Sequence, residues 1–280
     1  MRYGSKEARV GVLLVNHGSH SETWRQALTD LESRVRNGVM ADGRIQGMRT
    51  AFMEYTEPSI ATQLKQFDAE GFTDIIIVPI FLTVSPHTHN DIPNIIGQKE
   101  DARTIEMLNA EKIERYRPRA RTYTVPNLDF TDILMRNVAH RVKELSMHSE
   151  REGLVLIGYG DETYEKEWGD LFDRVANYVN QEVGVSDYTY GWCGHIVRYS
   201  PEKTTEAVER ILSRKEKAIV IPVLVAHDEM FQVRIIGRGI DQVSNRASVV
   251  YRPDAILPDV NVEQWVIDIT AEYLNLILNG

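Results

Sequence analysis

Short apolar runs alternate with segments of helical periodicity along most of the chain. The first run, GVLLV at residues 11–15, is too short for a helix and rich in β-forming residues, so it predicts a buried strand. Four apolar residues then recur at helical spacing: Trp24, Leu28, Leu31 and Val35. They predict a helix over residues 22–36, capped by Ser19 or Ser21. Alternating strands and amphipathic helices are typical of an α/β fold with a parallel sheet.

The same alternation continues through the first half of the chain. Three further runs predict strands: residues 48–55, 74–82 and 121–125. The second of these runs, DIIIVPIFL, suits a central strand covered on both faces, and Pro79 inside it predicts a bulge or local irregularity. Pro58 fits the first turn of the helix that follows the second strand. An amphipathic helix is predicted over residues 129–145.

The pattern then restarts, which indicates an internal duplication. Residues 153–160 (GLVLIGYG) mirror residues 11–18 (GVLLVNHG), and three later landmarks recur in the same order at offsets of 140 to 143 residues. We therefore predict an α/β protein of two duplicated halves, each a parallel four-stranded sheet flanked by helices. The predicted halves are residues 1–148 and 149–280, because the polar run MHSERE at 147–152 marks the joint.

Composition narrows the classes of function. The 280 residues are 42% hydrophobic and 26% charged, which is ordinary for a globular protein. A net charge of −9 argues against nucleic acid as a partner. No run approaches the roughly 20 apolar residues of a membrane span, and the N-terminus lacks a signal-peptide pattern, so a cytoplasmic location is expected. Cys193 is the only cysteine, which excludes an intrachain disulfide and a cysteine-rich zinc site.

Three chemically active side chains follow the predicted strands of the first half. His17 follows the first strand, Glu54 ends the second and His87 follows the third. The carboxyl ends of parallel strands meet at one edge of a sheet, so these side chains can converge on one crevice. Two imidazoles and a carboxylate suit a divalent metal ion, and they equally suit proton transfer near neutral pH. Taken singly, each has a structural explanation in a turn or a helix cap.

Other polar residues near these strands are weaker candidates. His20 and His89 are expected to be accessory at most, and Asp91 is better explained as a helix cap than as a catalytic group. In the second half, Tyr159 stands where His17 stood and Val197 where Glu54 stood. That half is therefore interpreted as a degenerate repeat that closes the crevice.

A second site in that degenerate half stays open as an alternative. It would consist of His195, His227 and Glu229, with Cys193 and His195 on the second strand of that half. The GxGxxG, P-loop and GxSxG motifs are absent, which argues against dinucleotide binding, a P-loop nucleotide site and an α/β-hydrolase nucleophile.

Three segments, taken together, resemble the class II chelatases of tetrapyrrole biosynthesis. LLVNHGS at residues 13–19 resembles their LLxxHGS opening, and AFMEYTEPSI at 51–60 resembles FLExxEPSI. VPIFLTVSPHTHNDIP at 78–93 resembles VPLFLxxGxHxxxDIP. The chain is similar to the long, two-domain form of the CbiX/SirB-like sirohydrochlorin chelatases. It departs from their pattern at His20, which replaces an arginine or another polar residue, and at Ser85-Pro86, which replaces small residues or glycine. The extra histidines offer an altered metal preference or a metal relay.

The resemblance implies an ATP-independent insertion of Co²⁺ or Fe²⁺, with Ni²⁺ as a further candidate, into sirohydrochlorin. It implies that His17, His87 and Glu54 bind the metal and accept protons, with no permanently bound cofactor. The rim arginines that would pair with substrate carboxylates are expected to be Arg198, Arg234 and Arg238. A monomer or homodimer is expected, acting on a tetrapyrrole and a metal ion and on neither nucleic acid nor membrane. The alternative is a non-catalytic tetrapyrrole or metal carrier.

Overall fold

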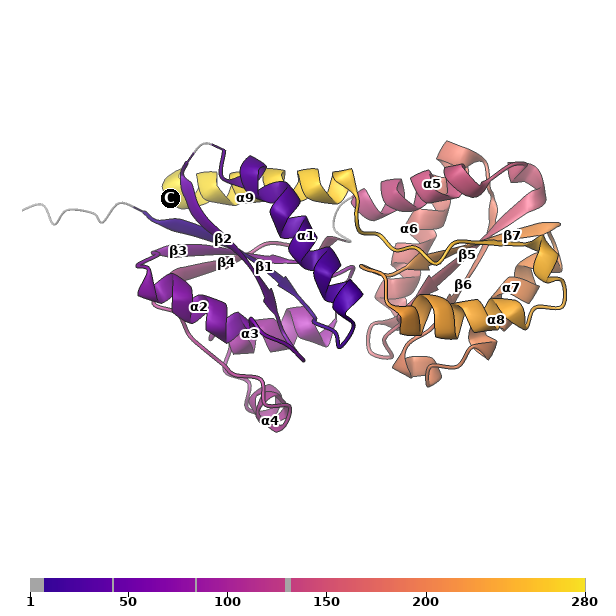
Figure 1. The fold of residues 1–280 in the computed structure, drawn as a ribbon. Helices are drawn as coiled ribbons and strands as arrows, with labels where there is room; N and C mark the ends of the chain where they lie inside the picture. The colour runs from indigo at the N-terminus through magenta and orange to yellow at the C-terminus, as the bar shows by residue number, and fades with distance from the viewer. Residues whose placement is uncertain (1–7, 42, 84, 129–131, 280) are drawn as a thin grey trace, which may run out of the picture. The chain divides into compact units, whose positions relative to one another are not determined.

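The computed structural model describes residues 8–41, 43–83, 85–128 and 132–279. The chain forms two compact units. The first comprises residues 1–81, 86–127 and 262–280, and the second comprises residues 82–85 and 128–261. Each unit contains one four-stranded parallel sheet (Figure 1). The predicted fold class, two α/β halves with parallel four-stranded sheets, is confirmed.

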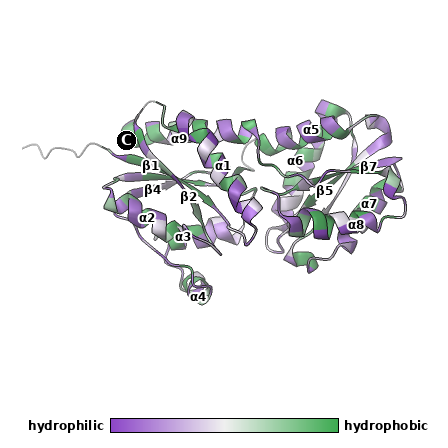
Figure 2. Cartoon of the chain, viewed as in Figure 1, coloured by the Kyte–Doolittle hydropathy of each residue, from purple (hydrophilic) through white to green (hydrophobic). Residues whose placement is uncertain are grey.

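The sheet of the first unit has the strand order β2-β1-β3-β4. Its strands are β1 (Val10–Asn16), β2 (Ile45–Phe52), β3 (Asp74–Pro79) and β4 (Arg121–Thr124). Every residue of β1 and β3 is buried, because these central strands are covered on both faces. The strands are correspondingly among the most hydrophobic segments of the chain (Figure 2).

Helices cover both faces of this sheet. They are α1 (Glu22–Val39), α2 (Ile60–Ala69), α3 (Ile92–Ile95) and α9 (Val260–Asn279), whereas α4 (Ala102–Ala110) packs on α3. Helices α2 and α3 share one core cluster with Leu13 and Val15 of β1. Ser21 caps α1 by accepting a hydrogen bond from the amide of Trp24, as one of the two predicted caps. Between β3 and α3 lies a short π-helix, η1 (His87–Asp91).

The second unit repeats this plan with the order β6-β5-β7-β8. Its strands are β5 (Glu152–Gly158), β6 (Asp187–Trp192), β7 (Lys217–Val223) and β8 (Val249–Tyr251). Its helices are α5 (Ile133–Leu145), α6 (Glu165–Val183), α7 (Glu202–Leu212) and α8 (Arg238–Asp241), and the π-helix η5 (Glu229–Gly237) precedes α8. Two 3₁₀ turns complete the loops next to β6 and β8, η4 (His195–Val197) and η6 (Arg246–Ser248), and a third, η3 (Ser149–Arg151), precedes β5.

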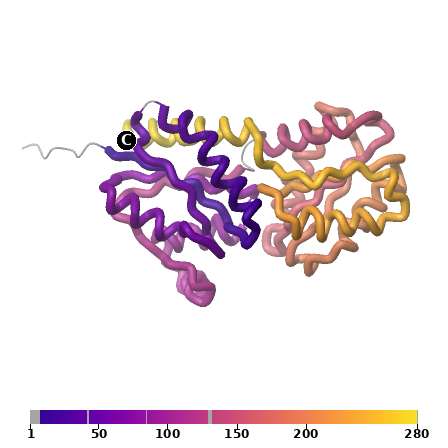
Figure 3. Tube along the Cα trace, viewed as in Figure 1, coloured from indigo at the N-terminus to yellow at the C-terminus, as the bar shows by residue number. Residues whose placement is uncertain are grey.

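The last helix of each sequence half belongs to the other unit. Helix α5 precedes the joint at residue 148, yet it packs on α6 and β7, and buried Arg141 donates to the carbonyl of Pro222 at 2.9 Å. Helix α9 ends the chain, yet it lies beside α1 (Figure 3), where Gly38 faces the side chain of Ile267. The compact units therefore depart from a simple division at residue 148, because these two helices are exchanged.

Local departures from the predicted elements occur mainly at strand ends. β2 stops at Phe52, so Glu54 lies in the following turn, and β3 stops at Pro79, which ends the strand and forms no bulge. Pro79 has no amide hydrogen to continue the ladder, and Ile80 donates to Val15 beyond it. Pro58 was predicted in the first turn of α2, but it lies before the helix, whose N-cap is Ser59. The carbonyl of Pro58 accepts a hydrogen bond from the amide of Phe52 at the end of β2.

Two further segments complete the comparison with the sequence. Cys193 and His195 lie beyond the end of β6, with His195 in η4, so their placement on that strand was wrong. The predicted helix at 129–145 is observed from Ile133 onward, and residues 129–131 lie outside the described part of the chain. Among the described residues, every helix is too short or too polar to cross a bilayer.

Candidate metal centre

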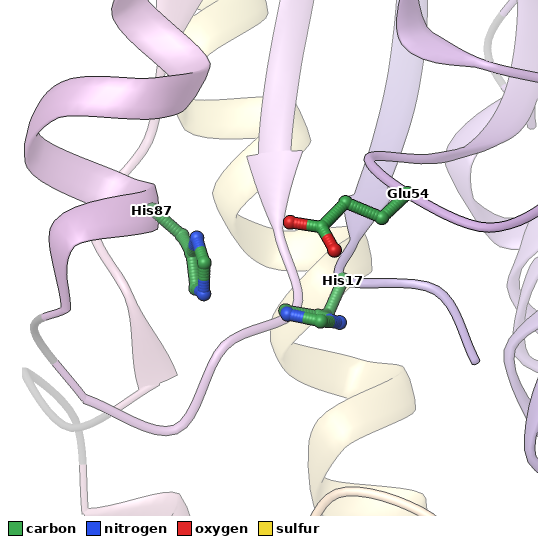
Figure 4. A group of neighbouring side chains, drawn as sticks. All are labelled: His17, Glu54 and His87. Atoms are coloured by element: carbon green, nitrogen blue, oxygen red, sulfur yellow. The ribbon is translucent and has the colours of Figure 1, made fainter. Parts of the chain in front are cut away.

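Three loops at one edge of the first sheet carry the predicted functional side chains. His17 directly follows β1, Glu54 lies two residues past the end of β2, and His87 is the first residue of η1 after β3. In the strand order β2-β1-β3, the central β1 places His17 between the other two. One potential ligand atom from each residue lies within 4.8 Å of the other two. The carboxylate of Glu54 points toward the two imidazole rings (Figure 4).

The hydrogen bonds of the two histidines leave the same ring nitrogen available on each. His17 Nδ1 lies 3.0 Å from the carbonyl oxygen of Gly18, and His87 Nδ1 lies 2.7 Å from Asp91 Oδ2. Both partners are acceptors, so in the neutral form of each ring Nδ1 carries the hydrogen and Nε2 keeps its lone pair. The rings meet edge to face, with centroids 4.7 Å apart. Two such Nε2 atoms with a carboxylate form a donor set suited to a divalent first-row metal ion.

Burial keeps the first of these imidazoles neutral. The pKa of His17 is lowered, chiefly because burial disfavours the imidazolium, and also because His87 is nearby. The carbonyl of Gly18 and the carboxylates of Glu54 and Asp91 act in the opposite direction and are outweighed. A neutral imidazole is the form that binds metal, so His17 is a ready ligand at neutral pH.

Asp91 plays a different part from the predicted helix cap. It occupies the N-cap position of α3, but its side chain makes no capping hydrogen bond. Its carboxylate instead accepts from His87, four residues earlier in η1. The i, i+4 spacing on a helical segment is the sequence signal that predicts this pairing. Asp91 therefore fixes the orientation and tautomer of His87.

Replacing Asp91 by asparagine tests this orienting role. The amide would still occupy the space, but it would lack the charge that holds the Nδ1 hydrogen of His87, so the Co²⁺ affinity is expected to fall about 10- to 100-fold. Titration calorimetry with Co²⁺ measures this affinity. Asp101→Asn is a matched control, since Asp101 caps α4 through Thr104, away from the histidines. An Asp91→Asn affinity within twofold of the wild type would refute the assignment.

The position of Glu54 depends on backbone contacts with the loop of His17. The amide of Glu54 donates to the carbonyl of His17 at 2.9 Å. Gly18 has a φ of +96°, and a Cβ there would lie 2.2 Å from the carbonyl oxygen of Glu54. Only glycine permits this close approach. Next to Glu54, Tyr55 has a φ of +69° and a largely exposed ring.

A cavity of about 770 Å³ adjoins Glu54 within the first unit. Its lining includes Ile60 and Ile95 on the apolar side and Glu111 and Lys112 on the polar side. The pKa of Glu111 is raised by burial and by the charges of Glu54 and Asp91. Sequence reasoning missed Glu111, which lies just beyond α4, because no spacing or motif connects it to the three strand ends.

The remaining histidines lie outside this group. His20 is exposed and its ring packs 4.5 Å from that of Tyr55, and the exposed His89 accepts from Lys99 through its backbone carbonyl. In the second unit, His195 Nδ1 lies 3.4 Å from the hydroxyl of Tyr159, whereas His227 donates to the carbonyl of Pro253.

Glu229 is paired with Arg234. His195, His227 and Glu229, which were considered for a second site, therefore each contact a different partner. Over residues 8–279, gaps aside, only His17, Glu54 and His87 form a cluster of at least three potential metal ligands.

Part of the sequence is similar to known proteins. The sequence model of the CbiX family matches residues 11–145. The sirohydrochlorin cobaltochelatase of Methanosarcina barkeri is 30% identical over 96 residues, which are 33% of this chain and 68% of that protein. That of Methanopyrus kandleri is 33% identical over 88 residues, 31% of this chain. The match spans only 59% of the Methanopyrus protein's length.

Solved structures match over nearly the whole chain. The sirohydrochlorin chelatase SirB from Bacillus subtilis subspecies spizizenii, in complex with cobalt, superposes with a TM-score of 0.66 at 21% identity. The match covers 94% of this chain and 96% of that one. CbiX, described as the terminal enzyme for siroheme biosynthesis in denitrifying bacteria, gives a TM-score of 0.59 at 15% identity, covering 94% and 98%. These likenesses establish a shared fold that includes both units.

Proposed function

Because the chain belongs to the CbiX family, we propose that it is a metal chelatase, a lyase that inserts Co²⁺ or Fe²⁺ into sirohydrochlorin without ATP. The observation that carries the proposal is the group of His17, Glu54 and His87, whose ligand atoms lie within 4.8 Å of one another. Relatives named sirohydrochlorin cobaltochelatase and SirB structures with cobalt or iron support the choice of metals. The reaction would serve cobalamin or siroheme biosynthesis.

The proposed reaction exchanges one metal ion for two protons. A divalent ion enters the macrocycle as two pyrrole N–H bonds break, so the charge of the macrocycle and metal is balanced by two released protons. The Nε2 atoms of His17 and His87 hold the incoming ion, because both imidazoles donate through Nδ1. The Glu54 carboxylate lies beside them as an acceptor for the released protons.

Several features of the sequence interpretation belong to this proposal. The first half, residues 1–148, would carry the active site, and the second, residues 149–280, would be a degenerate repeat. A cytoplasmic location, a monomeric or homodimeric state, and the absence of nucleic-acid or membrane partners remain predictions. Ni²⁺ is retained only as a metal to be tested.

The test is an anaerobic insertion assay followed by absorbance. Co²⁺, Fe²⁺ and Ni²⁺ are each offered with sirohydrochlorin, and protoporphyrin serves as the control macrocycle. The wild type is expected to accelerate insertion of Co²⁺ or Fe²⁺ into sirohydrochlorin, and the His17→Ala, His87→Ala double variant is expected to lose this activity. A fully active double variant would refute the site. Binding of the metallated product with no insertion above the uncatalysed rate would instead identify a carrier.

A further inference from the structure

The turn that carries Glu54 is strained at the residue that follows it. Tyr55 has a φ of +69°, in the left-handed region. The amide of Thr56 donates to the carbonyl of Glu54 at 2.9 Å, so this hydrogen bond spans Tyr55 alone. A three-residue turn with a positive φ at its centre is rare and strained. With a side chain as bulky as tyrosine, this backbone is an outlier, and such outliers concentrate at functional sites.

The strain occurs where two loops of the first unit meet. The amide of Glu54 donates to the carbonyl of His17 at 2.9 Å, and the carbonyl of Glu54 lies against Gly18, where a Cβ would come within 2.2 Å of it. Both backbone groups of Glu54 therefore face the loop after β1. Since Tyr55 is the next residue, its conformation sets the direction in which the chain leaves this contact.

The ring of Tyr55 contacts the same loop. Its centroid lies 5.9 Å from that of His17, at an interplanar angle of 42°, and 4.5 Å from that of the exposed His20. Ring pairs at these separations attract one another beyond the effect of burial. The side chain of Tyr55 is 57% exposed, so burial accounts for little of its position. Of its two ring neighbours, His17 belongs to the metal group, and this contact therefore bears on a ligand.

The imidazole of His17 has three neighbours that determine its orientation. Its Nδ1 lies 3.0 Å from the carbonyl oxygen of Gly18, and the ring of His87 meets it edge to face at 4.7 Å. A single hydrogen bond would leave the imidazole free to pivot about Nδ1. The rings of His87 and Tyr55 restrict that motion. Contacts that orient a ligand in this way change the metal affinity of a site although they touch no metal.

The second unit provides an internal comparison. Tyr199, 144 residues after Tyr55, has a φ of +57° and is 42% exposed, so the duplication has kept the strained residue. Its ring lies 6.3 Å from that of Phe231, and its hydroxyl lies 3.4 Å from that of Tyr159. Among the described residues, the one cluster of three potential metal ligands lies in the first unit. The backbone conformation is thus common to both halves, whereas the contact with a ligand imidazole is particular to Tyr55.

We propose that Tyr55 is a positioning residue of the metal centre, whose ring restricts the orientation of His17 and whose strained turn directs Glu54 toward it. Tyr55 acts through these two side chains, not as a ligand. The inference rests on the proposed function for the assignment of His17 and Glu54 as ligands. It accounts for a strain that asparagine or glycine at this position would relieve.

The test is the Co²⁺ affinity of Tyr55→Asn, measured by titration calorimetry on the full chain. Asparagine tolerates a positive φ but removes the ring. The dissociation constant for Co²⁺ is expected to rise about tenfold, the scale for losing a contact that orients a ligand. The urea midpoint of the metal-free protein is expected to stay the same or to rise, because the strain is relieved. A merely structural residue would instead lose stability.

Two further variants separate the ring from the backbone. Tyr55→Phe keeps the ring and should keep the Co²⁺ affinity within about twofold of the wild type, the scale of an ordinary surface substitution. Tyr199→Asn makes the same backbone change in the second unit and is the matched control, with an unchanged Co²⁺ affinity. The visible absorption of bound Co²⁺ reports the ligand geometry. It should change in Tyr55→Asn and in neither of the other two variants.

The outcomes separate this inference from the proposed function. If Tyr55→Asn binds Co²⁺ as tightly as Tyr199→Asn, while His17→Ala loses binding, the inference is overturned and the proposed site stands. Weaker binding accompanied by a lower urea midpoint would show a structural role and would also overturn the inference. If His17→Ala binds Co²⁺ like the wild type, the proposed site fails and the inference fails with it.

Discussion

Replacing His17 by alanine is expected to reduce the rate of metal insertion by about 10²- to 10⁴-fold, the range for losing a group that acts directly on the reacting atoms. His17 is the residue between the other two strand ends, its Nδ1 is held by Gly18, and burial keeps its imidazole neutral. Its loss removes one of two nitrogen donors from the group. The measurement is the initial rate of Co²⁺ insertion into sirohydrochlorin, with the Co²⁺ affinity determined in parallel.

The neighbouring His20 provides the control for this substitution. His20 is three residues away and exposed, and its ring contacts Tyr55 outside the metal group. His20→Ala should keep the rate within about twofold of the wild type, the scale of an ordinary surface substitution. Free imidazole should restore part of the activity of His17→Ala, since it can occupy the space of the lost ring. Equal losses in the two variants would show that the wrong histidine has been assigned.

Substituting alanine for Gly18 is expected to lower the free energy of unfolding by about 2–4 kcal/mol and to abolish tight Co²⁺ binding. Two costs combine in this change. A φ of +96° costs an alanine about 1–2 kcal/mol, and the new Cβ would lie 2.2 Å from the carbonyl oxygen of Glu54. Since that oxygen belongs to the backbone, the turn that carries Glu54 must move away from His17. Urea denaturation and Co²⁺ titration report the two effects.

Gly71→Ala separates the backbone strain from the clash. Gly71 has a φ of +80°, and a Cβ there would meet no atom within 4 Å. This variant should therefore lose only the conformational part of the stability, about 1–2 kcal/mol, and bind Co²⁺ normally. The proposed role of Gly18 fails if both variants lose the same stability and both retain the metal.

Strand ends were predictable from the sequence because a buried parallel strand leaves a strong, short-range pattern. The run at 11–15 predicted β1, and its end fixed the location of His17 within one residue. The second strand was less accurate, since apolar residues continue past Phe52 into the turn, where Met53 is buried. Convergence of His17, Glu54 and His87 followed from topology alone, because parallel strands bring their carboxyl ends to one edge. Their catalytic role stays a prediction.

Interactions between segments without a shared pattern were not predictable. Asp91 was assigned to a helix end because its chemistry suits a cap, and its i, i+4 spacing from His87 acquires meaning only once residues 87–91 are seen to be helical. Glu111 approaches Glu54 through the placement of the loop after α4, which no periodicity encodes. For a related reason, the sequence did not indicate which sheet α5 and α9 pack against. An apolar stripe shows which face of a helix is buried, but not which sheet covers it.

The exchange of α5 and α9 has a consequence for any attempt to divide the chain. A fragment ending at residue 148 would keep its sheet but lose α9, whose buried residues include Trp265, Val266 and Leu274. The complementary fragment would lose α5 and with it the buried Arg141, which holds the Pro222 carbonyl. This is the connectivity of a domain-swapped dimer fused into one polypeptide. Neither fragment should fold alone, whereas the two produced together should reassemble by returning each helix to its sheet.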